Sequence, residues 1–319
     1  MTLLRWVFAA LQPISPAASA WLAERLFFTA RRTRLSAGAR AMQASGRRFT
    51  LRVEGRRVVG WRWGPGAAPV IYLVHGWGSR GVRLASFVEP LVALGYAVVT
   101  YDAPGNGASG RGMTSMPDYA RALAAVVAHQ GRDRVPEAIV GHSMGCAAIA
   151  LALAWGLEAR RLVFLAPAAD PPAWVLPFAQ LLGLRPEVIE RVRVRSQRRL
   201  RVRWDALNVC DIARRIARPP LLIVHDERDD TVRYQDGVAI ARAWPEARLI
   251  TTSGLAHRGV TNDPGVVRQA TEFLTQGSNL TESYALEWEM FYRADRPSAT
   301  PYAAGIARWH DTKSVEFPG

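Results

Sequence analysis

Six short apolar runs, each ending in turn residues, constrain the fold of this 319-residue chain more than any other feature. Such runs are typical of strands that are buried on both faces of a sheet. Longer segments of helical pattern separate them. This alternation predicts an α/β fold, with a mostly parallel sheet and helices on both of its faces. The runs are PVIYLVHG, YAVVTYDAP, EAIVGHS, RLVFLAP, PLLIVHD and ARLITTSGLAH, between residues 69 and 257.

Two segments depart from this rhythm. Residues 51–63 alternate like two antiparallel strands that turn at Glu54 and Gly55. Residues 168–218 have a helical pattern without a convincing core strand, which predicts a helical cap inserted above the strand ends. We therefore expect an N-terminal amphipathic helical segment over residues 1–48, a core over 49–167 and 219–278, a cap or lid over 168–218, and a C-terminal tail over 279–319.

The sharpest local signal is the glycine-flanked serine in EAIVGHSMGCAAIALAL, where a strand runs into Gly141-His142-Ser143-Met144-Gly145 and then into a helix. A serine hydroxyl is a poor nucleophile, so catalysis needs it exposed and next to a base. A tight strand-to-helix turn exposes the serine and requires small neighbours. The pattern is common by itself, but its place between a buried strand and an alanine-rich helix makes Ser143 a candidate nucleophile.

An acyl-transfer serine also needs hydrogen-bond donors for the oxyanion of its tetrahedral intermediate. The backbone N–H of Met144 lies at the start of the expected helix. A second donor is expected on the loop after an earlier strand, and His75-Gly76-Trp77-Gly78 is such a loop. We therefore expect the backbone N–H groups of Trp77 and Met144 to form the oxyanion site.

His257 is the candidate base, because it lies on a loop that follows a glycine after the final strand. From that position its imidazole can lie over Ser143. The other histidines have a surface, structural or terminal position in the predicted fold. They are His75, His129, His142, His225 and His310.

The order of HGWG, GHSMG, HDERDD and GLAHR resembles the α/β-hydrolase superfamily over residues 50–278. YDAPGNGAS is similar to a loop frequent in that superfamily, although Asn106 stands where many members have histidine. The chain is most similar to bacterial hydrolases of unassigned substrate with an apolar, arginine-ended N-terminal segment. The resemblance implies the order nucleophile, acid, histidine. Epoxide hydrolases and haloalkane dehalogenases use aspartate as nucleophile, and Ser143 argues against both.

Several carboxylates compete for the role of the acid that orients His257. Asp226 belongs to a strand end, and Glu227 is expected to be solvated. The superfamily pattern of aspartate, two residues and valine implies Asp229, with Asp230 next and otherwise expected to cap a helix. Asp170, on the loop after RLVFLAP, is an outside candidate. A metal site among these acids is not expected, because no second histidine stands at ligand spacing.

The formal charge of +14 raises the question of a polyanionic partner. The basic residues are arginines except for Lys313, they are scattered, and no nucleic-acid motif appears, so no nucleic-acid partner is expected. The N-terminus resembles a secretory signal, but Gln12 and Pro13 break its apolar run. We expect a cytoplasmic protein. Bulky apolar residues of the N-terminal segment such as Trp21 and Phe28 could lie on a bilayer surface as a peripheral membrane contact, although packing against the body of the protein is the more frequent explanation for such residues.

Together these features predict a serine hydrolase, carboxylesterase- or lipase-like, which cleaves an ester, thioester or related acyl bond. Its triad would be Ser143, Asp229 and His257, and it would need no cofactor or metal. The substrate is expected to be a small molecule with an acyl or ester group, and the bulky apolar residues near Trp174 and Phe178 predict an apolar pocket. Acyl transfer, carbon–carbon bond hydrolysis, cofactor-free peroxidation and a non-catalytic scaffold are the alternatives.

Overall fold

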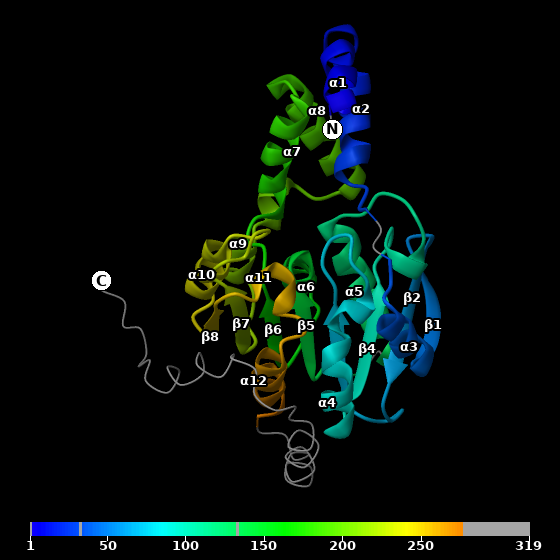
Figure 1. The fold of residues 1–319 in the computed structure, drawn as a ribbon, viewed down its shortest axis with the longest axis vertical. Coiled ribbons are helices and arrows are strands. Elements are labelled where there is room, and N and C mark those ends of the chain that lie inside the picture. The colour runs from blue at the N-terminus through cyan, green and yellow to red at the C-terminus, as the bar shows by residue number, and fades with distance from the viewer. Residues whose placement is uncertain (1, 32–33, 132–133, 277–319) are drawn as a thin grey trace, which may run out of the picture.

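The structure is a computed structural model that describes residues 2–31, 34–131 and 134–276; the predicted tail over residues 279–319 lies outside them. Its strands form one sheet in the order β1-β2-β4-β3-β5-β6-β7-β8 (Figure 1). From β4 to β8 neighbouring strands are parallel, whereas β1 and β2 are antiparallel. The predicted mostly parallel sheet is confirmed. The strands are β1 Arg47–Val53, β2 Arg56–Trp63, β3 Val70–Val74, β4 Ala97–Asp102, β5 Ala138–His142, β6 Leu162–Leu165, β7 Leu221–Asp226 and β8 Ala247–Thr252.

The predicted antiparallel pair is β1 and β2. Their connection is a tight turn in which both central residues have positive φ, 48° at Glu54 and 76° at Gly55. That conformation matches the right-handed twist of a two-stranded hairpin. The hairpin extends the sheet beyond β4 and away from the parallel strands.

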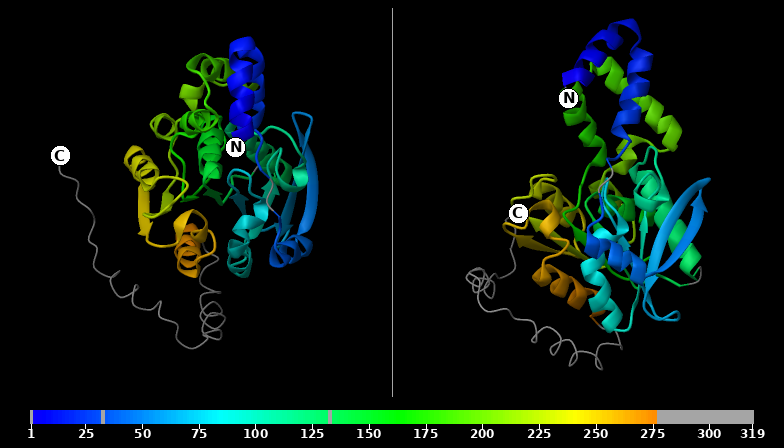
Figure 2. Two further views of the ribbon diagram at one scale, coloured as in Figure 1. Left: turned by 45° about the horizontal axis from the view of Figure 1, so that its top comes forward. Right: turned by 45° about the vertical axis from the view of Figure 1, so that its right-hand side comes forward.

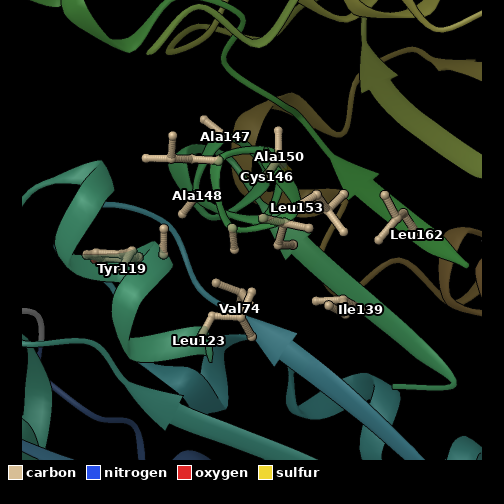
Figure 3. Close-up of a cluster of buried hydrophobic side chains, with 14 of the residues drawn as sticks. Val74, Tyr119, Leu123, Ile139, Cys146, Ala147, Ala148, Ala150, Leu153 and Leu162 are labelled. Carbon is tan, nitrogen blue, oxygen red and sulfur yellow. The ribbon is translucent and has the colours of Figure 1, made fainter. Parts of the chain in front are cut away.

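Helices cover both faces of the sheet, as the alternating pattern predicted. Figure 3 shows one of the two hydrophobic layers, where α5 and α6 pack on the central strands. α6 is buried almost all round, and alanines at 147, 148, 150 and 152 let it lie close to its neighbours. The helices of this face are α5 Met116–Gly131, α6 Met144–Ala154, α9 Val209–Ala213 and α10 Tyr234–Ala243. The other face carries α3 Ala37–Ser45, the 3-10 helix η1 Gly81–Phe87, α4 Val88–Ala93 and α12 Pro264–Thr275.

A third layer of helices lies above the carboxyl ends of the strands, and its helices come from two distant parts of the chain (Figures 1 and 2). It combines the N-terminal hairpin, α1 Thr2–Ile14 and α2 Pro16–Phe27, with α7 Val175–Leu182 and α8 Pro186–Leu200. These helices share a small hydrophobic cluster separate from the layers around the sheet. We call this four-helix layer the cap; the N-terminal helices are part of it. The buried members of its cluster are Phe8, Ala20, Ala23, Leu182, Val188 and Val192.

Polar contacts fix α1 and α2 to the rest of the cap. The carboxylate of Glu24, only 5% exposed, accepts hydrogen bonds from Arg195 at 3.1 Å and Arg199 at 2.8 Å. Gln12 donates to the carbonyl of Gly183 and accepts from the N–H of Arg185. The arginine-rich run over residues 191–203 lies largely in α8, and two of its members, Arg195 and Arg199, hold the N-terminal hairpin in place.

The remainder of the interval between β6 and β7 returns to the sheet. The 3-10 helices η3 (Pro171–Trp174) and η4 (Trp204–Leu207) border the cap, and α9 packs into the layer under α6. Two short helices remain in the connections, η2 (Gly107–Ser109) and α11 (Ala256–Gly259). None of the helices in the described ranges has the length and apolar character needed to cross a bilayer.

Candidate active site

Ser143 lies on a strained turn between β5 and α6. Its φ of 55° and ψ of −123° are unusual for a residue with a side chain. The turn is held by hydrogen bonds from its N–H to the carbonyl of Leu165, at 2.9 Å, and from the N–H of Cys146 to the carbonyl of Ser143, at 3.0 Å. This geometry carries the serine above the carboxyl end of the sheet, as the motif predicted.

Both glycines of the motif are needed because the turn is so tight. A Cβ atom at Gly141 would lie 2.6 Å from Cδ1 of Ile149 and 2.9 Å from the backbone nitrogen of Cys146. A Cβ atom at Gly145 would overlap the carbonyl oxygens at the end of β3, that of His75 at 2.8 Å among them. Close approach of α6 to β3 therefore depends on the absence of side chains at these two positions.

Asp229 and His257 meet at the ends of β7 and β8. Nδ1 of His257 donates to Oδ2 of Asp229 at 2.8 Å, which leaves Nε2 of the imidazole unprotonated in the neutral ring. The other carboxylate oxygen accepts from the backbone N–H groups of Thr231 and Val232, each at 2.8 Å. Nε2 of His225 lies 3.3 Å from Oδ2 as well. Asp229 is thus fixed from both sides, with its side chain buried.

These contacts keep Asp229 ionised. Burial raises the pKa of its carboxyl, but the hydrogen bonds from His225, His257 and the two backbone N–H groups outweigh burial and hold that pKa below its ordinary value. A carboxylate that stays charged at neutral pH stabilises an imidazolium beside it.

Asp230 does not share this position. Its carboxylate is exposed and accepts only from the hydroxyl of Thr231, at 2.9 Å. The expected helix cap is wrong, because α10 starts at Tyr234, four residues later, with Arg233 at its N-cap position and no side-chain cap. The outside candidate Asp170 precedes η3, where Asp236 rather than a histidine is its charged neighbour.

Asp226 has a structural role that the sequence did not reveal. Its buried carboxylate accepts from the backbone N–H groups of Arg228, at 3.0 Å, and Leu255, at 2.9 Å, and from the hydroxyl of Thr252, at 2.8 Å. Burial raises the pKa of Asp226, and these donors more than offset it, so the pKa is lowered. Asp226 thereby fixes the loop that ends in His257.

His142 supports His257 from beneath. The two rings lie 4.7 Å apart, and Nε2 of His142 donates to the carbonyl oxygen of His257 at 3.0 Å. Burial, together with the charge of His257, lowers the pKa of His142 to about 3. It is therefore neutral, and acts here as a hydrogen-bond donor rather than as a base.

Ser143 and His257 line the same cavity, and no hydrogen bond joins their side chains in the described structure. Both residues are largely buried, Ser143 at 9% and His257 at 6% exposed. Catalytic contacts of this kind often tighten only when substrate is bound.

Hydrogen bonds to the carbonyl oxygen of Gly76 fix the orientation of the peptide between Gly76 and Trp77. That oxygen accepts from Nδ1 of His75 at 2.7 Å and from the hydroxyl of Tyr119 at 3.1 Å. In a trans peptide the N–H points away from the C=O, so the N–H of Trp77 points away from Tyr119. Neither this N–H nor that of Met144, the first residue of α6, has a hydrogen-bond partner among the described residues.

The loop after β4 is fastened to the same strand ends. The carboxylate of Asp102 accepts from the N–H groups of Gly81 at 2.8 Å and Ala108 at 2.7 Å. Nε2 of His75 accepts from the N–H of Ala103 at 3.0 Å. The similarity of this loop to a superfamily motif thus corresponds to a structural role, namely fixing the segment that carries Trp77.

A cavity of about 710 Å³ opens above Ser143 and is bounded by the cap. Ser143, His142, His257, Trp77 and Met144 lie at its base. Its walls are mostly apolar, as predicted from the cap residues near Trp174 and Phe178. The wall also contains the end of α2, which the sequence alone did not point to. The apolar wall residues include Leu26, Phe27 and Phe28 of the N-terminal segment and Trp174, Phe178, Leu181, Leu200, Trp204 and Leu207.

No group of three or more histidine, cysteine, aspartate or glutamate side chains in the described ranges could hold a metal ion. His225 and Asp229, which lie close together, are linked by a hydrogen bond instead.

Comparisons with known proteins agree with the fold described above. A family model described as serine aminopeptidase, S33, matches residues 66–212, and one described as TAP-like protein matches residues 203–282. No curated protein matches the sequence significantly.

Solved structures with the same fold are similar over most of the chain. Est1E from Butyrivibrio proteoclasticus with bound ferulic acid is 21% identical, with a TM-score of 0.56, over 77% of this chain and 100% of its own. A membrane phospholipase A described as a bacterial virulence factor is 18% identical, with a TM-score of 0.55, over 86% and 96%. A thioesterase domain from the curacin biosynthetic pathway is 17% identical, with a TM-score of 0.54, over 72% and 99%.

Proposed function

Because the chain belongs to the α/β-hydrolase superfamily, we propose that it is a serine hydrolase that cleaves an ester, thioester or related acyl bond. The observation that carries this proposal is the base of the cavity. A strained, glycine-flanked Ser143 lies there with a histidine whose Nδ1 is bound to a buried carboxylate.

In the proposed reaction the hydroxyl oxygen of Ser143 attacks the acyl carbon, and Nε2 of His257 takes the hydroxyl proton. Asp229 stabilises the imidazolium that results. The unpaired N–H groups of Trp77 and Met144 donate to the oxyanion. His257 then gives its proton to the leaving group, and water, activated by the same histidine, releases the acyl group from Ser143.

The apolar wall of the cavity supports an acyl group of low polarity in the substrate. The cap, including the end of α2, provides aromatic and aliphatic surface above Ser143. Apolar surface removed from water contributes about 25 cal/mol for each Å². The printed names of the structural relatives, an esterase, a phospholipase and a thioesterase, agree with acyl-bond hydrolysis.

Replacing the nucleophile tests the proposal. We expect Ser143→Ala to abolish hydrolysis of p-nitrophenyl butyrate and octanoate and labelling by a fluorophosphonate probe. Ser253→Ala is the matched control, because Ser253 is exposed on the loop before His257 and does not line the cavity. Undiminished turnover by Ser143→Ala, or no labelling of the folded wild type, would contradict the proposal; the latter would favour a non-catalytic scaffold.

A second pair of variants tests the acid. Asp229→Asn is expected to lower kcat by roughly 10³–10⁴-fold, because the imidazole loses the carboxylate that fixes its tautomer. Asp230→Asn should remain within about twofold of wild type, since exposed substitutions away from the site have small effects. Equal losses in the two variants would show that Asp229 is not the triad acid.

A further inference from the structure

The cavity above Ser143 is lined by positive charge without any negative charge. Its walls contain Arg31, Arg83 and Arg258, and no aspartate or glutamate side chain is part of the lining. In the described part of the chain, the backbone groups of Arg83 and Arg258 are hydrogen-bonded, but neither guanidinium group makes a hydrogen bond or an ion pair. By contrast, Arg195 and Arg199 in the cap are both bound to Glu24.

Arg83 and Arg258 lie on the histidine side of the cavity. Arg258 follows His257 on α11, and Arg83 belongs to η1, just beyond the loop that carries Trp77. Arg83 and Arg258 both line the cavity, and burial together with the charge of Arg258 lowers the pKa of Arg83. The charge of Arg83 also acts on His142, whose ring is 4.7 Å from that of His257.

Two half-exposed cations held near each other without an acidic partner are a poor arrangement for stability alone. A guanidinium presents several N–H donors in one plane and binds phosphate through paired hydrogen bonds. An anion between Arg83 and Arg258 would remove their repulsion and supply acceptors for donors that have none within the described residues. The apolar wall under α2 and α7 offers no comparable partner for a charged group.

We propose that Arg83 and Arg258 bind a phosphate group on the leaving half of the substrate, while its acyl half lies against the apolar wall. The orientation rests on the proposed function, because His257 protonates the leaving group and therefore defines the side from which that group departs. Two kinds of substrate share this chemistry. One is an acyl ester of a phosphorylated alcohol, such as a lysophospholipid, and the other is an acyl thioester of a phosphorylated thiol.

A binding experiment tests the subsite without catalysis. Calorimetric titration of Ser143→Ala with glycerol 3-phosphate should show saturable binding, and glycerol should show none. We expect Arg83→Gln/Arg258→Gln in the same background to bind at least about tenfold more weakly, as the loss of charge-assisted hydrogen bonds implies. Arg268→Gln is the control, because Arg268 is exposed on α12 and does not line the cavity. Equal affinities in the double variant and the control would overturn the subsite.

A specificity experiment then separates the two kinds of substrate. The kcat/KM for octanoyl glycerol 3-phosphate is compared with that for monooctanoyl glycerol, and octanoyl-coenzyme A with octanoyl-N-acetylcysteamine. The ratio of phosphorylated to neutral substrate should exceed one in at least one pair, and fall at least about tenfold in Arg258→Gln. Arg258 is exposed, so folding is not at risk. If Arg258→Gln left the ratio unchanged in both pairs, the phosphate subsite would be contradicted. Failure of the proposed serine hydrolase function would look different, because turnover would then not depend on Ser143.

A separate observation concerns the outer face of α1. One stripe of this helix, with Phe8 and Gln12, is buried against the cap, but the opposite stripe is apolar as well and faces solvent. Leu3, Trp6 and Ile14 are 76%, 70% and 81% exposed. Helix α1 lies at the end of the molecule farthest from the sheet (Figures 1 and 2). Exposed apolar surface of this kind marks a contact with another protein or with a membrane.

The charge of the cap indicates which kind of surface the outer stripe of α1 contacts. Residues 2–27 and 175–200 contain eight arginines and three glutamates. Tryptophan and aliphatic side chains bordered by arginine are typical of helices that lie in the interface of an anionic bilayer. We infer that the outer stripe of α1 docks on an anionic lipid surface. Leu181, which lines the cavity and is itself 51% exposed, belongs to α7, a helix in contact with α1.

Vesicle co-sedimentation tests this docking surface. Full-length protein should bind vesicles containing about one third phosphatidylglycerol and bind much less to pure phosphatidylcholine, with binding weakened by salt. Trp6→Ser/Ile14→Ser should lose most of the binding. Trp155→Ser is the matched control, because Trp155 is 45% exposed outside the cap. A wild-type dimer that the double variant splits, with no binding to either vesicle, would show that a second copy covers the stripe and would overturn the lipid assignment.

Discussion

Nε2 of His225 lies 3.3 Å from Oδ2 of Asp229, the same oxygen that accepts a hydrogen bond from His257. His225 is fully buried at the end of β7, and its Nε2 also lies 3.1 Å from the carbonyl oxygen of Val232. One carboxylate oxygen is therefore shared by two histidines, of which only one lines the cavity. This makes His225 a positioning residue for Asp229.

Removing the His225 donor should alter catalysis through Asp229. We expect His225→Met to lower kcat about tenfold with little change in KM, the size of one lost hydrogen bond of about 1–1.5 kcal/mol. With one donor fewer, Asp229 stabilises the imidazolium of His257 more strongly, so the acid limb of the kcat/KM profile should move to higher pH. His225→Gln, which keeps an N–H donor, should recover most of kcat. A pH profile unchanged in His225→Met would contradict this role.

Asp226→Asn should destabilise the protein in a pH-dependent manner. The pKa of Asp226 is lowered in the folded state, so its charge contributes stability above the unfolded pKa, and that contribution is lost as the pH falls through the folded pKa. At pH 7 we expect a loss of about 1.5–3 kcal/mol, typical of hydrogen bonds to a charged group. The difference in melting temperature between wild type and variant, measured by circular dichroism, should shrink as the pH falls from 7 towards 3. A difference independent of pH would show that the charge is not the cause.

Glu24→Gln should weaken the cap, because Arg195 and Arg199 lose their shared buried carboxylate. We expect the free energy of unfolding to fall by about 1–3 kcal/mol, and the cap to be cleaved faster by a protease where α2 packs on α8. Glu187→Gln is the control, since its ion pair with Arg191 is exposed and within one helix, worth roughly 0.3–0.5 kcal/mol. Equal stabilities of the two variants would contradict the buried bridge.

Gly145→Ala should lose activity and stability together. The added Cβ would overlap the carbonyl oxygens at the end of β3, so α6 and Ser143 would have to move. We expect destabilisation of about 1–3 kcal/mol and at least a tenfold loss of kcat/KM. Gly38→Ala is the control, because a Cβ atom there would have no neighbour within 4 Å and Gly38 lies in α3. That variant should be slightly more stable, by about 0.5–1 kcal/mol. Thermal unfolding and ester hydrolysis measure both effects.

The elements that position the site were predictable because they depend on local chemistry. The turn at Ser143 has to have small neighbours, and the loop at Gly76 and Trp77 has to approach it closely, so both are visible as glycines in the sequence. The sheet itself was predictable from its buried strands, each of which reads as a continuous apolar run.

The parts that could not be predicted depend on contacts between distant residues. Nothing near Phe28 shows that it lines a cavity above Ser143, because that follows from the packing of α2 on α8. The role of Asp226 was missed because its donors include Leu255, which the sheet brings beside it. The prediction that Asp230 caps the next helix was wrong because the loop before α10 is longer than the local pattern indicated.

The packing of α2 on α8 has a consequence for how the protein is made. Glu24 and its partner Arg195 are 171 residues apart in the chain. At typical rates of synthesis of about 5–20 residues per second, the first two helices leave the ribosome roughly ten to thirty seconds before α8 exists. During that interval both stripes of α1 are exposed, including the one that later packs on the cap. The nascent hairpin therefore exposes apolar surface until α8 has been made, and the cap is completed only when its last-made helix meets its first-made ones.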